Sequence, residues 1–300
     1  MAEAGAWKFT DDRGRTVTAK RRPERVAAYV RAGAALWDLG IPLVGVFGSA
    51  HDGASWDRAK AGGLPSAGIP YAGAGDDLNE QTLSALRPDL IVDVTYDEKN
   101  PYALSDPLGE RMEEAGVPSV ALTVGSEASF AGILERFAEL ADALGADAQA
   151  PARLAAATRL AAAEQAVRVA VAAGPVPLRV LALSAAGPEQ VHVARPRTWP
   201  DLKHLMDLGV HMTDPGEGAG INWMSMSWEQ AASLGADLVL ADSRSNAVQP
   251  QDLTALPAWR ALTAGATVEP WNPETPCSAA AQTGFFRAVA QAQHTALSNR

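Results

Sequence analysis

The stretch Gln149–Ala173, QAPARLAAATRLAAAEQAVRVAVAA, decides the predicted fold. It is rich in alanine and contains no glycine, and alanine loses no side-chain rotamer freedom on entering a helix. Asp147 can cap the start, Pro151 suits the first turn, and Gly174 ends the helix. At ~1.5 Å per residue the helix would be roughly 37 Å long, about the diameter of a small domain.

Short apolar runs alternate with helical patterns on both sides of this helix. The N-terminal runs are at 26–30, 43–47, 90–94 and 120–124, and the C-terminal runs are at 178–183, 237–241 and 267–271. The order strand, helix, strand predicts parallel pairing with crossover helices in each half. We also expect a helix over 127–144, capped by Ser126, and a hairpin formed by Trp7–Thr10 and Arg15–Thr18.

The predicted fold is therefore α/β, with two Rossmann-like lobes bridged by one long rigid helix and a ligand cleft between the lobes. The predicted boundaries are 1–146 for the first lobe, 147–174 for the bridging helix and 175–300 for the second lobe. The alternative is an ordinary surface helix inside one large domain.

Composition excludes several classes of function. The net charge is −10 and the pI is about 5, whereas a nucleic-acid-binding surface needs clustered Lys and Arg. The sequence has a single cysteine, Cys277, so it cannot form an intramolecular disulfide. No apolar run approaches the ~20 residues that span a bilayer.

The N-terminal residues MAEAGAWKF show no charged segment followed by an apolar core, and no cysteine that could carry a lipid. We therefore expect either a cytoplasmic protein or an extracytoplasmic, envelope-associated protein whose leader has been removed.

Aromatic and basic residues recur after the predicted strands of both halves. In parallel α/β sheets, ligands bind beyond the carboxyl ends of the strands. An aromatic and basic surface there suits a large ligand that is partly anionic and partly apolar. A single loop tryptophan is more often half-buried structure, and only the recurrence favours binding. The predicted ligand-binding residues are Tyr29, Arg31, Trp56, Tyr96, Lys99, Arg195, Arg197, Trp223 and Trp271.

No motif in the sequence indicates catalysis or a metal site. His192, His204 and His211 lie near one another in sequence, but no H-E-x-x-H or paired C-x-x-C motif is present. The glycine-rich segment Gly216–Gly220, with Trp223 just after it, follows no predicted strand, so we expect a flexible loop rather than a phosphate cradle. We predict a protein that is not an enzyme and has no resident cofactor.

Four segments together resemble one family, the substrate-binding proteins of ABC importers for ferric siderophores, haem and cobalamin. The first two are FTDDRGRTVTAKRRPERVAAYVRAGAALWDLGIPLVGV at 9–46 and LNEQTLSALRPDLIVD at 78–93. The others are SWEQAASLGADLVLAD at 227–242 and LPAWRALTAGATVEPW at 256–271. The resemblance covers about residues 9–297. It implies two α/β lobes bridged by the long helix, a small hinge motion and a monomer.

The resemblance also implies a function and partners. We expect the protein to bind an iron–siderophore chelate and deliver it to an ABC permease, as an exported, often lipid-anchored protein. The family docks through one glutamate per lobe; Glu229 matches in the second lobe, whereas in the first lobe Gln81 aligns and Glu80 precedes it. The alternatives are a cobalamin- or haem-binding protein of the same family, and a cytosolic metabolite-binding or biosynthetic protein on this fold.

Overall fold

The computed structural model describes residues 6–65 and 67–298, and its contacts divide the chain into two compact units. Unit 1 extends to Ala155 and includes Glu274–Ala281, and unit 2 comprises Ala156–Pro273 and continues from Gln282. Residues 1–5, which carry much of the prediction about a leader, lie outside the described part. The predicted boundaries at 146 and 174, and the cleft between lobes, stay predictions.

Unit 1 begins with the predicted hairpin, in which β1 (Trp7–Thr10) pairs antiparallel with β2 (Thr16–Ala19). Alternate residues of β1 are buried, as expected for a strand with one covered face. Asp11 organises the turn, since its carboxylate accepts the backbone N–H groups of Arg13 and Arg15, both at 3.0 Å.

The sheet of unit 1 has the order β4-β3-β5-β6 and is parallel throughout. Every residue of β3, β5 and β6 is buried, which is typical of parallel strands covered on both faces. Its strands are β3 (Val26–Tyr29), β4 (Leu43–Phe47), β5 (Leu90–Thr95) and β6 (Ser119–Thr123). Its helices are α1 (Val30–Asp38), α2 (Glu80–Ala85), α3 (Asp106–Glu114) and α4 (Phe130–Ala143), with 3₁₀ turns η1 (Arg58–Lys60) and η2 (Gly75–Asp77).

Helix α4 starts three residues later than predicted. Ser129, not Ser126, is the cap, and its hydroxyl accepts the N–H of Gly132 at 3.0 Å. The preceding residues form a turn in which Ala128 N donates to Gly125 O. Gly125 lies so close to the backbone of Tyr96 that a Cβ there would be 2.3 Å from its carbonyl oxygen. The sequence indicated a serine cap correctly, but the turn at 125–128 delays the start of the helix.

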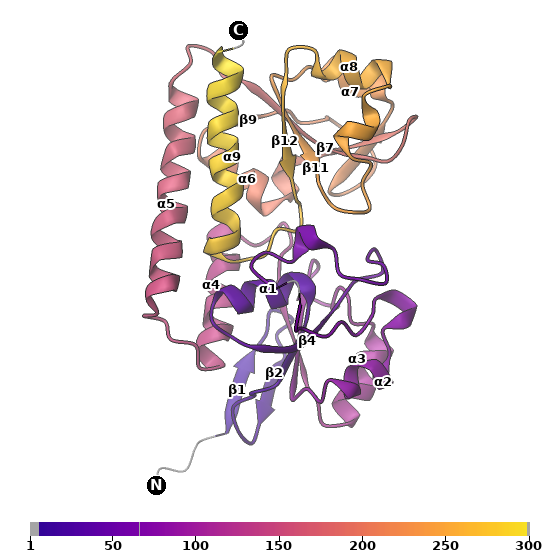
Figure 1. The fold of residues 1–300 in the computed structure, drawn as a ribbon, viewed down its shortest axis with the longest axis vertical. Coiled ribbons are helices and arrows are strands. Elements are labelled where there is room, and N and C mark those ends of the chain that lie inside the picture. The colour runs from indigo at the N-terminus through magenta and orange to yellow at the C-terminus, as the bar shows by residue number, and fades with distance from the viewer. Residues whose placement is uncertain (1–5, 66, 299–300) are drawn as a thin grey trace. The chain divides into compact units, whose positions relative to one another are not determined.

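The long helix is confirmed: α5 (Pro151–Ala172) is unbroken over 22 residues (Figure 1). Its buried residues are spaced by three or four and form one stripe, as in a helix packed on one side; they are Ala156, Leu160, Ala163, Val167 and Ala170. Asp147 accepts the N–H of Gln149 in the turn before the helix. Because the helix crosses from Ala155 to Ala156, it joins the two units covalently.

Unit 2 contains a six-stranded sheet with the order β10-β8-β7-β11-β12, with β9 pairing with β7. Its strands are β7 (Arg179–Ala185), β8 (Val191–Ala194), β9 (His211–Met212), β10 (Trp223–Met226), β11 (Leu238–Asp242) and β12 (Thr267–Trp271). Its helices are α6 (Pro200–Asp207), α7 (Trp228–Leu234), α8 (Pro257–Thr263) and most of α9 (Ala279–Ser298), with 3₁₀ turns η3 (Pro196–Thr198) and η4 (Pro250–Leu253). Two α/β units joined by α5 confirm the predicted fold class.

The prediction of parallel pairing holds for β7, β11 and β12 but is wrong for β8. Strands β9 and β10 were not predicted from the sequence. Strand β8 runs antiparallel to both β7 and β10. The reason is the short connection after β7, in which Ala186 N donates to Gln190 O. A parallel crossover needs a dozen or more residues, whereas a few suffice for a hairpin. Trp223, expected in a loop, is the first residue of β10.

Candidate functional site

A buried charge network lies at the end of β3 in unit 1. Tyr29 is fully buried, and its hydroxyl donates to Glu274 Oε1 at 2.7 Å. Lys60 Nζ lies 3.0 Å from both Glu274 Oε2 and Asp52 Oδ1, with 1% of its side chain exposed. Burial, and then the charge of Glu274, raise the pKa of Tyr29 well above its ordinary value. The phenol therefore stays protonated and serves as a donor.

Arg31 extends this network because α1 starts directly after β3 and places the residue in its first turn. Its Nη1 donates to the Tyr96 hydroxyl at 3.1 Å and its Nε to the carbonyl of Thr275 at 3.2 Å. Burial lowers the pKa of Arg31. The electrostatic interactions with Cys277, Tyr96 and Glu274 raise it by more, so the pKa lies above its ordinary value. Arg31 thus stays charged and bound to segments far apart in the sequence.

Tyrosine rings cover this end of unit 1. Tyr96 and Tyr102 meet edge to face with centroids 4.9 Å apart, and Tyr102 meets Tyr29 in the same way at 5.6 Å. Tyr96 and Tyr102 are half-buried, so their rings remain partly accessible. Trp56, also half-buried, packs on Tyr71 at 6.5 Å. This surface combines aromatic faces with hydroxyl groups.

Two aspartates shape the loop that carries these tyrosines. Asp93 is buried, and its carboxylate accepts the N–H groups of Val94, Ala103 and Leu104 at 2.7–2.9 Å. Burial raises the pKa of Asp93 to about 6, although these hydrogen bonds oppose the shift. Asp97 accepts the backbone N–H groups of Asn100 and Lys99, which hold its pKa below the ordinary value. The Lys99 side chain is exposed, outside the buried network.

Three tryptophans form a cluster in unit 2. The ring centroids of Trp199 and Trp223 are 4.9 Å apart, and Trp271 lies 5.6 Å from Trp199 and 5.7 Å from Trp223. Trp271 Nε1 donates to Asp201 Oδ2 at 2.7 Å, and Trp199 Nε1 donates to the carbonyl of Asn222 at 3.0 Å. Trp199 and Trp271 are buried and Trp223 is half-buried, so Trp223 presents the accessible part of this cluster.

The two predicted arginines of unit 2 have different surroundings. All three side-chain nitrogens of Arg195 donate to carbonyl groups of the segment Gly216–Gly220, at 2.6–3.0 Å. Arg197 is exposed, in η3. Since β8 is antiparallel to β7, Arg195 does not lie at the common carboxyl edge of the parallel strands, as the prediction assumed.

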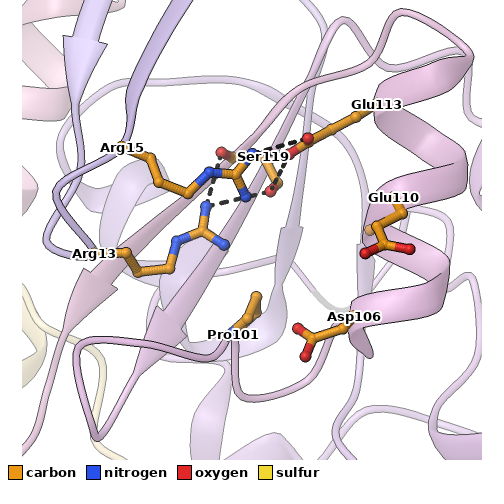
Figure 2. A pocket seen from close by; sticks show the side chains of 8 residues that line it. Arg13, Arg15, Pro101, Asp106, Glu110, Glu113 and Ser119 are labelled. Atoms are coloured by element: carbon orange, nitrogen blue, oxygen red, sulfur yellow. Dashed lines mark hydrogen bonds and ion pairs between the residues drawn. The ribbon is translucent and has the colours of Figure 1, made fainter.

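A small pocket of about 140 Å³ lies beside β6, the edge strand of the unit 1 sheet (Figure 2). Two of its charged groups pair with each other: Arg15 Nη2 lies 2.8 Å from both carboxylate oxygens of Glu113. Arg13 binds Asp11 at 2.7 Å and the carbonyl of Ser119 at 3.0 Å. Asp106 and Glu110 face these arginines from α3. The Arg15–Glu113 pair therefore links the hairpin to α3 beside this pocket.

The two glutamates expected to dock to a transporter both lie in the first turn of a helix. Glu80 follows Asn79, and Glu229 follows Ser227 and Trp228; both cap residues form capping boxes. Glu80 Oε2 lies 3.6 Å from Arg111 Nε, with both side chains about half exposed. Among the described residues, Glu229 has no ion-pair partner.

The structure therefore brings together some predicted residues and separates others. Tyr29, Arg31 and Tyr96 share one network, and Trp223 and Trp271 share one cluster. Trp56 packs beside Tyr71, while Lys99 and Arg197 stand apart. The predicted set of ligand-binding residues does not include five members of these groups: Asp52, Lys60, Tyr102, Trp199 and Glu274. Aromatic spacing could have indicated Tyr102 and Trp199, but no local signal indicates that Lys60 is buried beside Glu274.

The structure offers no metal centre of ordinary type within residues 6–65 and 67–298, where no three His, Cys, Asp or Glu side chains are grouped to hold an ion. His204 instead pairs with Glu164 at 2.8 Å, and His192 contacts Ser225 Oγ at 2.8 Å. None of the helices in this part of the chain is long and apolar enough to cross a bilayer.

Comparison with known proteins adds a family and a set of similar structures. The family model described as periplasmic binding protein matches residues 28–268. DesE, a ferric-siderophore receptor protein from Streptomyces coelicolor, is 30% identical, with a TM-score of 0.85 over 96% of this chain and 98% of that chain. A search of curated proteins found no match.

Two more distant structures share the fold. One is the siderophore-binding protein FhuD from Vibrio cholerae with bound Fe³⁺–Desferal, at 17% identity and a TM-score of 0.66, covering 92% of this chain and 99% of that chain. The other is a periplasmic heme-binding protein from Pseudomonas aeruginosa, at 19% identity and a TM-score of 0.62, covering 91% and 93%.

Proposed function

The chain belongs to the periplasmic binding protein family, and on that premise we propose that it binds a ferric siderophore and delivers it to an ABC importer. The observation that carries the proposal is the likeness to DesE, which extends over nearly the whole of both chains. Such a protein acts by binding its ligand and catalyses no reaction.

The two units offer complementary chemistry for such a ligand. A ferric chelate presents metal-bound oxygen atoms and an organic scaffold. In unit 1, the Tyr96 and Tyr102 rings and the charged Arg31 offer hydrogen bonding and aromatic contact, and charge-assisted hydrogen bonds to oxygen are the stronger kind. In unit 2, Trp223 and its two neighbours offer an apolar aromatic wall. Lys99 and Arg197 stay proposed contacts at the rim.

Direct binding measurements test the proposal. Tryptophan fluorescence titration and native mass spectrometry would compare Fe³⁺–Desferal, other ferric siderophores, haem and cobalamin, with iron-free Desferal as control. We expect a one-to-one complex with a ferric siderophore and weaker binding without iron. If the protein prefers haem or cobalamin, the proposed ligand is wrong, while the assignment to the family still holds. Binding to none would favour a cytosolic metabolite-binding or biosynthetic role.

The predicted tryptophans can be tested in the same titration. Replacing Trp56, Trp223 and Trp271 together by Phe should weaken the ligand-induced quench and the affinity. Trp37→Phe is the matched control, because Trp37 is an exposed residue of α1 outside both aromatic groups. If the triple variant binds and quenches like the unmodified protein, these residues do not contact the ligand.

Delivery requires a surface that meets the permease, and we propose that Glu229 dominates it. Glu80 is already paired with Arg111, and one residue along a helix turns a side chain by ~100°, so Glu80 differs from the aligned Gln81 in direction. Glu229→Gln should slow association with the reconstituted permease more than Glu80→Gln does, and added salt should reduce both effects. A large loss from Glu80→Gln alone would reverse the assignment.

An importer component works outside the cytoplasm, so we propose an extracytoplasmic, envelope-associated location. Fractionation of the native cells, with N-terminal sequencing of the recovered protein, tests it. Recovery from the envelope fraction is expected, whereas recovery only from the cytoplasm would support the alternative role.

A further inference from the structure

The most unusual side-chain arrangement in unit 2 is that of Arg195. Its Nη1, Nη2 and Nε donate to the carbonyl oxygens of Gly216, Gly218 and Gly220 at 2.6, 2.9 and 3.0 Å. A guanidinium has five N–H donors in a planar fork, so one side chain can hold three carbonyl groups of a single loop. In the described part of the chain no carboxylate pairs with it, so its engagement is with backbone.

The same loop is attached at its end to the tryptophan cluster. The carbonyl of Asn222 accepts two hydrogen bonds, one from the backbone N–H of Arg195 at 2.9 Å and one from Trp199 Nε1 at 3.0 Å. Gly220 has a φ of +93°, and a Cβ there would lie 2.1 Å from the carbonyl oxygen of Trp223. The loop therefore turns tightly directly before Trp223, in a conformation that glycine permits.

These contacts connect Arg195 to the orientation of the Trp223 indole, with which it forms no hydrogen bond or cation–π contact in the described part of the chain. We propose that Arg195 is a positioning residue: it folds Gly216–Gly220 into a fixed turn and so holds Trp223 edge-on to Trp199 before any ligand arrives. If the protein binds a ligand as proposed above, Arg195 contributes to the affinity by positioning Trp223 and not through its own charge. This consequence rests on the proposed function. It assigns Arg195 a role different from the direct ligand contact predicted from the sequence.

Three variants separate geometry from charge. Arg195→Gln removes the charge and the three-way hydrogen bonding, and Arg195→Lys keeps the charge but has a single nitrogen that cannot reproduce the planar fork. Arg197→Gln is the matched control for the measurements made without ligand, since it removes the same charge from an exposed side chain two residues away. Thermal melts of all three check that the fold is kept.

Two readouts need no ligand. Hydrogen–deuterium exchange of 213–222 reports the loop, and the exciton couplet in far-ultraviolet circular dichroism reports the closely spaced indoles. We expect faster exchange and a smaller couplet for Arg195→Gln and Arg195→Lys alike, and no change for Arg197→Gln. A loop and couplet that persist in both Arg195 variants would overturn the proposal, whether or not the protein binds a siderophore.

The affinity arm uses Fe³⁺–Desferal, which carries a free ammonium, and its N-acetylated form, which lacks that charge. Both Arg195 variants should weaken both chelates by roughly tenfold, which corresponds to about 1.4 kcal/mol. In a Trp223→Ala background, Arg195→Gln should add no further loss, because the effect passes through Trp223. Opposite effects on the two chelates, or full affinity in Arg195→Lys, would show that the charge acts directly. Binding of neither chelate by the unmodified protein contradicts the proposed function, while the loop readouts still decide the role of Arg195.

Discussion

Unit 1 and unit 2 place different chemistry around their candidate binding residues. In unit 1, buried charges and phenols bind one another, and Tyr29 reaches Glu274 although the two are 245 residues apart. In unit 2, three indoles pack on one another, with Trp199 edge to face with both Trp223 and Trp271. Hydrogen bonds from Trp199 and Trp271 fix two of the rings. A buried charge requires its partner, because desolvation is costly, whereas an indole can lose one neighbour and keep most of its burial. Unit 1 should therefore be the less tolerant of substitution.

The largest effect should come from removing the ammonium in unit 1. Lys60→Met leaves the carboxylates of Asp52 and Glu274 buried without their shared cation, and breaking a buried pair in this way costs about 3–5 kcal/mol. Urea unfolding measures the change. The control is Arg15→Gln, since the Arg15–Glu113 pair is partly exposed and worth at most about 1 kcal/mol. Equal losses of stability from the two variants would mean that the buried ion pairs of Lys60 contribute no more than the exposed Arg15–Glu113 pair.

The helix that joins the units should be the next most sensitive place. Ala162→Pro removes a backbone hydrogen bond within α5 and introduces a ring clash, which costs ~3 kcal/mol or more. Ala162→Gly is the control, at about 1 kcal/mol. Calorimetry also shows whether the units then melt separately. A melt unchanged by the proline would contradict an unbroken α5.

A pH dependence should follow from Asp93 in unit 1. Its folded pKa of about 6 lies above the ordinary value of 3.8, so its contribution to the free energy of unfolding is fully present below pH 3.8 and is lost as pH rises through about 6. The total is on the order of 3 kcal/mol at about 1.4 kcal/mol per pH unit. The difference in stability between the unmodified protein and Asp93→Asn, measured from pH 4 to 7, isolates it. A difference independent of pH would show that the hydrogen bonds to Asp93 prevail over its burial.

The smallest expected effect lies in the indole cluster of unit 2. Trp271→Phe removes the hydrogen bond to Asp201, and a hydrogen bond to a charged group is worth about 1.5–3 kcal/mol. Trp223→Phe should cost less, because Trp223 is half-buried and its indole N–H has no partner among the described residues. Thermal melts compare the two. A larger loss of stability from Trp223→Phe would show that Trp223, and not Trp271, contributes most to the stability of the cluster.

Local sequence was sufficient for most elements and insufficient for the candidate site. The predicted runs at 43–47, 90–94 and 267–271 are all strands in the structure. The run at 90–94 is buried at every position, as expected of a parallel strand covered on both faces. The short connection between β7 and β8 also carried a usable signal, which the prediction of parallel pairing overlooked. No such signal existed for Lys60, whose neighbours in sequence do not reveal the carboxylates that surround it.

The sequence by itself determined the long alanine-rich helix and the α/β class, because propensity and hydrophobic pattern are properties of neighbouring residues. It also supplied the aromatic and basic side chains that are proposed as ligand contacts. The tertiary structure alone decided which of those side chains are engaged by the protein itself. Arg195 looks free in sequence yet holds a loop through three carbonyl groups, and Tyr29 looks like a contact residue yet donates to Glu274. The physical reason is that a buried polar group must find its partner in space, and that partner can come from anywhere along the chain.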